Sequence, residues 1–296
     1  SHLGCSVWIF FIISGFIMCL TLELQRCAQF LVSRLIRIVP DHWLVIVFTA
    51  FLLIGFASLF NNAGFSFERL LGTKFFIPVW SEKFGFDPSL KLGWTLTYEM
   101  FFYVVLYVCF LVTKFYRSCA SCIFVGIVCV GYFLKPRKSS STHFYTDPII
   151  LAFCLGILLF EGHRKRKILT LTVMSSFWFA GVFLLSLYCL IYRSFSVAHR
   201  LFEFGLLSLV LIFCTLQFES ECKHSLVKRL LMSLGEMSYI FYLILMFILA
   251  IYARLFDFLF FPGFFLSIFS ILVACFAIHT FWDLKARALL NKLFLY

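Results

Sequence analysis

The sequence has few charged residues and few prolines for its length. Charged residues make up 13% of the 296 positions, and only 6 positions are proline. Hydrophobic residues make up 63% of the chain, and its mean hydropathy is +1.02. A water-soluble protein of this composition would expose one continuous apolar surface, so the composition excludes a soluble domain. We therefore expect an integral membrane protein.

Several familiar site motifs are also missing. The chain has no metal-ligand spacing, no glycine-rich phosphate loop and no strand-to-helix nucleophile motif. Most of the 12 cysteines lie inside apolar runs, where they behave as small hydrophobic side chains. The pair Cys119 and Cys122 has a redox or metal spacing, but no second pair accompanies it, so packing at a helix end is favoured. We expect no bound metal and no permanently bound cofactor.

Long apolar runs fill most of the chain. A transmembrane helix needs about 20 residues, and the length of the runs together with the absence of strand alternation favours helices over a barrel. The runs predict an all-α, polytopic transmembrane helix bundle of about nine helices, forming a single domain over residues 1–296. The run Ile149–Phe160 is short for a span. The nine predicted spans are Leu3–Leu22, Trp43–Phe60, Trp94–Val112, Cys119–Leu134, Ile149–Phe160, Ile168–Tyr192, Leu201–Phe218, Leu234–Ala253 and Phe258–Phe281.

The formal net charge of +11 comes from short basic clusters between the apolar runs. Such clusters orient membrane helices and do not indicate nucleic-acid binding. If the loops alternate sides, the set that includes the C-terminus carries more lysine and arginine, which predicts a cytoplasmic C-terminus and an outside Ser1. The break from Asn61 to Gly93 then lies outside, with part of it able to re-enter the protein. The chain opens without methionine or a signal peptide, so a segment is expected upstream.

Three motifs follow one another along the chain. They are FFIISGF at Phe10–Phe16, the form R-x-x-R-I-x-P-x-x-W at Arg34–Trp43, and WTLTYEMFFY at Trp94–Tyr103. A weaker fourth segment is LGEMSYIFYL at Leu234–Leu243. In their order and spacing these segments resemble the type 3 membrane acyltransferase family, and the resemblance spans most of the chain.

The resemblance implies a bundle of about ten helices that takes an acyl group, with acetyl expected, from cytoplasmic acyl-CoA. The acceptor implied is a hydroxyl of a cell-surface glycan or lipid-linked sugar, as in O-acetylation of a polysaccharide or lipopolysaccharide. A bacterial inner membrane is the implied location. The family's first helix normally carries an arginine and a histidine that serves as catalytic base, so this chain is expected to lack that helix. The family also often has a histidine where this chain reads Ile244 and Leu245.

The two arginines of the second motif are the predicted donor-binding residues. Arg34 and Arg37 are three positions apart and share a face on a helix. Guanidinium groups suit the phosphates of acyl-CoA, and a helix beginning at Pro40 would offer free N–H groups to an anion. The alternative is that both arginines only anchor the cytoplasmic end of a helix.

A carboxylate in the third motif is the predicted catalytic residue. Thr95, Glu99 and Tyr103 recur every four residues and form one polar stripe, and Trp94 marks the membrane interface. A charged side chain inside a bilayer costs at least about 2.5 kcal/mol, so it is rarely idle. Glu99 is expected to orient a catalytic histidine or bind a sugar hydroxyl. The alternative is a structural carboxylate bonded to a neighbouring helix.

Ser14 and His42 are two further site candidates. For Ser14, beside Gly15, close helix packing is favoured over a hydroxyl that lines the substrate path. His42 follows the arginine motif and is a candidate catalytic group near the donor, or equally an interfacial anchor. His279 lies four residues before Asp283, and a local His–Asp pair explains it.

Two other functions also fit a polytopic membrane protein. A transporter or flippase for a glycan precursor would have as many helices, although transporters usually show paired halves or broken helices, which this sequence lacks. An inactive acyltransferase fragment is the third interpretation. The expected partners are acyl-CoA, a glycan acceptor and the lipid bilayer, with no nucleic acid.

Overall fold

The computed structural model describes residues 4–25, 27–55, 67–80, 86, 93–164, 204–219, 232–245, 248 and 262–294. Within these ranges the regular structure is helical and no strand occurs, which confirms the all-α prediction. The predicted span Ile168–Tyr192 lies outside the described residues. The main helices are α1 (Gly4–Leu24), α2 (Cys27–Gly55), α3 (Phe67–Lys74), α4 (Gly93–Val112), α5 (Tyr116–Leu134), α6 (Ser141–Tyr145), α7 (Leu151–Arg164), α10 (Leu206–Glu219), α12 (Pro262–Ile278) and α13 (Leu284–Phe294).

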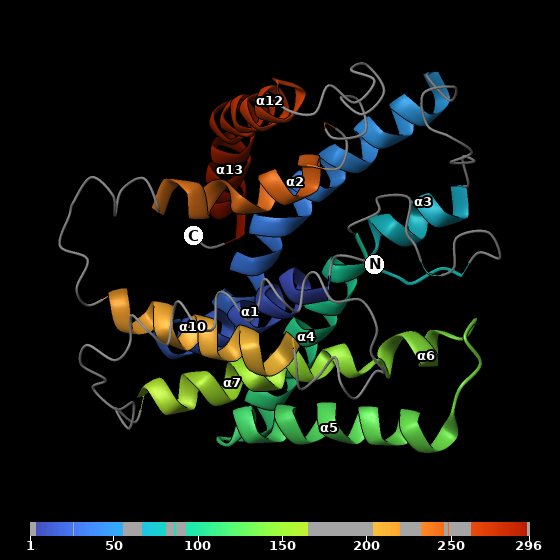
Figure 1. Ribbon diagram of the computed structural model, residues 1–296, viewed down its shortest axis with the longest axis vertical. Coiled ribbons are helices and arrows are strands. Elements are labelled where there is room, and N and C mark those ends of the chain that lie inside the picture. The colour runs from blue at the N-terminus through green and yellow to red at the C-terminus, as the bar shows by residue number, and fades with distance from the viewer. Residues whose placement is uncertain are drawn as a thin grey trace. The chain divides into compact units, whose positions relative to one another are not determined.

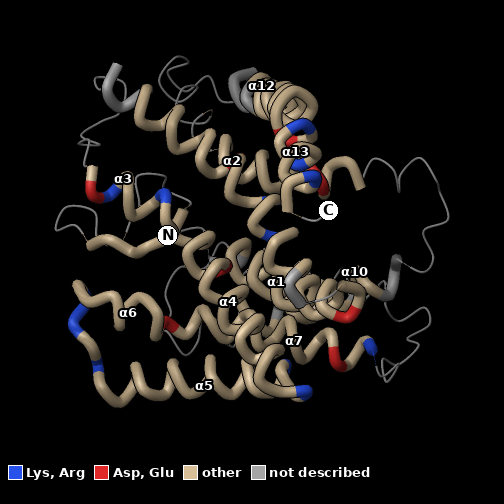
Figure 2. Tube along the Cα trace, turned by 180° about the vertical axis from the view of Figure 1, so that it is seen from behind, with Lys and Arg blue, Asp and Glu red and all other residues tan. Residues whose placement is uncertain are grey.

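Five helical stretches in the described part of the chain are long and apolar enough to cross a membrane. The protein is therefore a multi-pass integral membrane protein, as predicted. In Figure 2, the middles of α1 and α5 carry no charged residue. By contrast, α2 carries Arg34, Arg37 and Asp41 away from its ends. The five stretches are Ser6–Leu24, Gly93–Val112, Tyr116–Leu134, Ser141–Arg164 and Ile268–Phe294.

The chain folds as two compact units whose segments alternate along the sequence. Unit 1 comprises Ser1–Cys27 and Tyr98–Lys223, and unit 2 comprises Ala28–Thr97 and His224–Tyr296. The division falls inside α4, after its first five residues. Each unit therefore combines stretches that are distant in the sequence. The prediction of one domain over residues 1–296 stays a prediction.

Unit 1 is built on a close crossing of α1 and α7, which lie side by side in Figure 1. A Cβ atom placed on Gly15 would stand 2.6 Å from the carbonyl oxygen of Phe153, and one on Gly156 would stand 2.2 Å from that of Ile12. These separations are too short for any side chain, so the two backbones meet directly. Small residues commonly allow this approach in membranes, where packing drives helix association.

Aromatic rings fill the interior of unit 1 beside this crossing. The Phe153 ring of α7 packs against Phe11 of α1, with ring centroids 4.6 Å apart, and stacks on Phe102 of α4 at 4.3 Å. Phe102 also stacks on Phe124 of α5 at 5.5 Å. All four side chains are almost completely buried. These four phenylalanines fill the space between α1, α4, α5 and α7.

The short run predicted at Ile149–Phe160 belongs to a longer helical stretch. A 3-10 turn, η2 (Pro148–Ile150), precedes α7, and the Asp147 side chain caps it by accepting from the backbone N–H of Ile149 at 2.9 Å. Together with α6 this stretch reaches 24 residues, which is enough to cross a membrane. The sequence underestimated this span because polar residues interrupt its first half.

The described helices of unit 2 include α2, α12, the π-helical turn η4 (His279–Asp283) and α13. A further helix, Met232–Leu245, packs Ile240 and Ile244 against Ile271 and Cys275 of α12. Pro40 lies inside α2, which begins thirteen residues earlier at Cys27. The prediction that a helix starts at Pro40 is therefore wrong, and so is the anion site expected at that helix start. A proline inside a helix removes one hydrogen bond, and here the surrounding helix tolerates the loss.

Gly156→Ala should weaken unit 1, because the added methyl group would collide with the backbone of α1. Overpacking of this kind costs about 1–3 kcal/mol. Thermal unfolding of detergent-purified protein measures the effect as a lower melting temperature. Gly162→Ala is the matched control on the same helix, since a Cβ at Gly162 meets nothing within 4 Å in the described residues. Equal melting temperatures for the two variants would contradict the close crossing.

Candidate functional site

Glu99 lies in the interior of unit 1 and accepts hydrogen bonds from two hydroxyl groups. Ser14 Oγ of α1 donates to Glu99 Oε1 at 3.1 Å, and the hydroxyl of Tyr103, one turn further along α4, donates to the same oxygen. The exposed fractions of Ser14, Glu99 and Tyr103 are 5%, 7% and 1%. The structure therefore brings together three of the predicted site residues, and two hydroxyls offset the cost of burying the carboxyl group.

Thr95 extends the polar stripe of α4 by one turn, as the four-residue spacing predicts. It is 1% exposed, and its hydroxyl lies 2.6 Å from the hydroxyl of Tyr242 within unit 2. Trp94, at the start of α4, is half-buried. The predicted start of this helix at Trp94 differs by one residue from the observed start at Gly93.

Hydrogen bonding gives Ser14 a role that its position beside Gly15 did not reveal. Gly15 makes the close approach to α7, and Ser14 faces α4 and bonds Glu99. The sequence favoured a packing role for Ser14, and the structure shows in addition that Ser14 donates a hydrogen bond to Glu99. A carboxylate held by two hydroxyls can direct a proton in acyl transfer and equally holds α1 to α4.

The arginine motif lies within α2 rather than at a helix end. Arg34 and Arg37 are both partly buried in unit 2. One turn after Arg37, the Asp41 side chain is 1% exposed, and Arg37 acts on it as a favourable charge. The structure thus adds a buried carboxylate beside the predicted donor-binding residues.

Asp41 is part of a cluster of charged residues in unit 2. Its Oδ2 lies 3.9 Å from Nη2 of Arg287, and Arg287 forms a close ion pair with Asp283. Asp283 Oδ2 lies 2.8 Å from Nδ1 of His279. The predicted local pair of His279 and Asp283 is confirmed. The ion pair of Asp283 with Arg287 was missed, although its i, i+4 spacing was a visible signal. The link from Arg287 to Asp41 was also missed, because these positions are far apart in the chain.

His42 is buried in unit 2, with 0% of its surface exposed, so it is not an exposed interfacial anchor. Its Nε2 lies 2.9 Å from the carbonyl oxygen of Thr73, which can only accept, so Nε2 carries the proton. Nδ1 is therefore unprotonated and has no hydrogen-bond partner among the described residues. The ring stacks on Phe76 at 4.5 Å. Burial lowers the pKa of His42 to about 4, so the imidazole is neutral at pH 7.

In the segment after α2, Thr73 and Lys74 lie beside His42 and Trp43 of that helix. Besides the bond from His42 to Thr73, Trp43 Nε1 donates to the carbonyl oxygen of Lys74 at 3.3 Å. From His42 to its end at Gly55, α2 rises about 20 Å. Sequence analysis placed the break from Asn61 to Gly93 on the side opposite His42, with partial re-entry allowed. The hydrogen bonds show that Thr73 and Lys74 lie beside α2, and the predicted side of the membrane for this segment stays a prediction.

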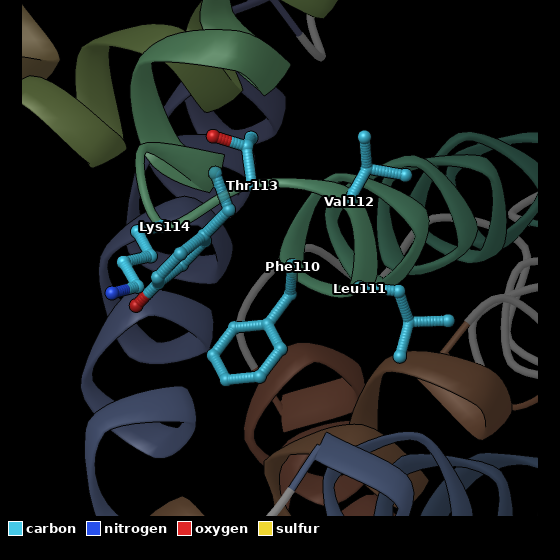
Figure 3. Close-up of a pocket in the computed structure, with 6 residues that line it drawn as sticks. Phe110, Leu111, Val112, Thr113 and Lys114 are labelled. Atoms are coloured by element: carbon cyan, nitrogen blue, oxygen red, sulfur yellow. The ribbon is translucent and has the colours of Figure 1, made fainter.

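A pocket of about 390 Å³ lies at the turn between α4 and α5. In Figure 3, Leu111 and Val112 point to one side of the turn, and Thr113 and Lys114 lie on the other. Val112 is thirteen residues beyond Glu99, which is about 20 Å along α4. The pocket is therefore not part of the site around Glu99.

An ion-pair network in unit 1 was also missed by sequence analysis. Arg117 of α5 bonds Glu23 of α1 at 3.1 Å and forms a close pair with Glu161 of α7. Arg164 lies 3.5 Å from Glu23 and 3.4 Å from Glu161. The four residues tie together the ends of three helices. Their chemistry is that of a structural clamp, since each charge is matched by an opposite one.

Comparison with known proteins gives two matches. A family model described as an acyltransferase domain matches residues 3–280. The chain is also similar to the exopolysaccharide production protein ExoZ of Rhizobium meliloti (strain 1021), with 33% identity over 178 residues. That alignment covers 58% of this chain and 55% of the relative, so the chain spans about half the length of the curated relative it matches. No solved structure matches.

Asp41 and His42 both precede the predicted span Trp43–Phe60. The two groups should make the free energy of unfolding depend on pH in opposite directions. Burial and the neighbouring Asp283 raise the pKa of Asp41 from 3.8 to about 7, while Arg287 and Arg37 oppose the rise. The folded state then binds this proton more tightly, so Asp41 makes stability fall as pH rises from about 4 to 7. The lowered pKa of His42 makes stability fall as pH drops from about 6.5 to 4.

Thermal unfolding of purified protein between pH 4 and 7 tests the two effects separately. Compared with wild type, His42→Gln should lose stability more steeply as pH rises, because only the effect of Asp41 remains. Asp41→Asn should lose stability more steeply as pH falls. If both variants kept the wild-type pH dependence, neither shifted pKa would hold.

Proposed function

Because the chain belongs to the family of acyltransferase domains, we propose that it moves an acyl group, expected to be acetyl, from cytoplasmic acyl-CoA to a hydroxyl of a cell-surface glycan or lipid-linked sugar. The similarity to a protein named for exopolysaccharide production supports a polysaccharide acceptor. The proposed location is a bacterial inner membrane with the C-terminus in the cytoplasm, as the distribution of basic residues predicts.

One observation carries the proposal: a carboxyl group lies buried in an apolar helical unit, bonded to two hydroxyls. In the proposed reaction the acceptor oxygen attacks the thioester carbonyl, an ester bond forms, and the carbon–sulfur bond breaks. The hydroxyl proton leaves the acceptor and ends on the sulfur of CoA. Glu99 is the proposed residue that takes or directs this proton, and Ser14, Thr95, Tyr103 and Trp94 are the proposed lining of the path. Positioned acids and bases of this kind contribute about 10²–10⁴-fold to rates.

The proposed donor-binding residues are Arg34 and Arg37 in unit 2. Both guanidinium groups stay charged at all relevant pH values and match phosphate geometry. His42 remains a second candidate base, close in sequence to the arginines. Its neutral imidazole has an unprotonated Nδ1, which is the form a base needs.

Arg37→Ala should weaken acyl-CoA binding, because a charged hydrogen bond to phosphate is lost. Such bonds are worth about 1.5–3 kcal/mol, or roughly tenfold to a hundredfold in Kd. Calorimetric titration of purified protein with acetyl-CoA measures the change. The exposed Arg137→Ala is a matched control and should bind as wild type does. Equal affinity in all three proteins would assign Arg37 to anchoring only.

Glu99→Gln should abolish most acyl transfer while acyl-CoA binding persists. Glutamine keeps the shape and can still accept a bond from Ser14, but it cannot take up a proton. We expect a rate loss of about 10²–10⁴-fold. The assay follows radiolabelled acetyl transfer to glycan in membranes from cells that express the full reading frame. Glu161→Gln removes a carboxylate from the ion-pair network of unit 1 and should retain transfer. Wild-type rates in Glu99→Gln would leave Glu99 with a packing role.

A further inference from the structure

Asp41 is a buried carboxylate, and a contribution to stability alone does not explain why this group is buried. Neither of its oxygens has a hydrogen-bond partner in the described ranges, and the side chain is 1% exposed. A buried charge without compensation costs several kcal/mol, so such a group needs nearby positive charges. Two arginines supply them, Arg37 on the same helix and Arg287 at the C-terminal end of unit 2.

Arg287 does not need Asp41 as a counter-ion. Its guanidinium already forms a close ion pair with Asp283, four residues earlier on the same helical stretch. Asp283 is also bonded to His279, and His279 Nε2 lies 4.0 Å from a carboxylate oxygen of Glu236. The negative charge of Asp283 acts unfavourably on Asp41. A second carboxylate beside Arg287 therefore adds an electrostatic cost, which Arg287 offsets in part and Arg37 offsets to a smaller extent.

We propose that Asp41 is a positioning residue of the donor site, holding Arg37 and Arg287 so that both guanidinium groups face the phosphates of acyl-CoA. This inference rests on the proposed function. It adds α13, which carries Arg287, to a site that the sequence confined to the motif on α2. The side chain of Arg287 is 21% exposed, while its Nε and Nη2 atoms are buried.

The geometry suits a ligand with more than one phosphate. Arg37 and Asp41 are four residues apart on α2 and so share one face of the helix. Arg287 Nη2 approaches the same carboxylate from another helix at 3.9 Å. The carboxylate of Asp41 thus attracts one guanidinium on its own helix and a second one on α13. Binding to groups that are already held in place loses less side-chain entropy than binding to free arginines.

Acyl-transfer kinetics at pH 8 test the proposal, since Asp41 is then largely ionised. Asp41→Asn keeps the shape of the side chain but lets both arginines move. The KM for acetyl-CoA should rise about tenfold, as expected for a weakened charged contact, and kcat at saturating donor should stay within about twofold of wild type. Glu161→Gln, which removes a carboxylate from the separate ion-pair network of unit 1, should change neither quantity.

A double-mutant comparison separates positioning from a general structural role. If Asp41 acts through Arg37, Asp41→Asn should raise KM much less in the Arg37→Ala background than in wild type. Should Asp41→Asn fail to fold, Arg287→Gln carries the same test, because it removes the second guanidinium and should also raise KM with kcat retained. Arg287→Lys, which keeps the charge, should recover part of the loss.

If the wild-type protein binds acetyl-CoA, two results would overturn this inference without affecting the proposed function. One is an unchanged KM in Asp41→Asn or Arg287→Gln. The other is a rise in KM on Asp41→Asn that is equal in the wild-type and Arg37→Ala backgrounds. A wild-type protein that binds no acetyl-CoA in calorimetric titration would overturn the proposed function, and this inference with it. The wild-type titration therefore distinguishes the two failures.

Discussion

The direct backbone contact of α1 with α7 determines what else unit 1 can contain. Gly15 and Gly156 leave no room for side chains between the two helices. Ser14 is turned by one residue from that contact and so faces α4, where it bonds Glu99. The aromatic rings of Phe11, Phe102 and Phe153 pack beside the same crossing. A larger residue at either glycine would move the serine away from the carboxyl group.

The two buried polar clusters handle charge in different ways. Around Glu99 in unit 1, two neutral hydroxyls donate hydrogen bonds to the carboxyl group. Around Asp41 in unit 2, carboxylates and guanidiniums alternate, which holds charged groups in place. The first arrangement suits proton transfer, and the second suits retention of an anionic ligand. The proposed acyl transfer from a phosphate-bearing donor would use both arrangements. Membership of the acyltransferase family favours an acyltransferase over the transporter interpretation.

Apolar runs predicted the helices well where polar residues lie only at the ends of the run. The runs Leu3–Leu22 and Cys119–Leu134 differ from α1 and α5 by only a few residues. The predicted helix start at Pro40 was wrong, because α2 begins at Cys27 and includes both arginines and Pro40. Proline is common in the first turn of a helix, and this local signal did not reveal the helix that precedes it. The contact between Asp41 and Arg287 joins positions far apart in the chain, and a single sequence carries no signal for such pairs.

The length of α2 links the arginine motif to the segment that follows the helix. As one continuous helix of 29 residues, α2 is about 44 Å long. Arg34 and Arg37 belong to the same helix as His42 and Trp43, whose side chains bond the backbone carbonyl groups of Thr73 and Lys74. A displacement of Thr73 and Lys74 would therefore act on the helix that carries the two guanidinium groups.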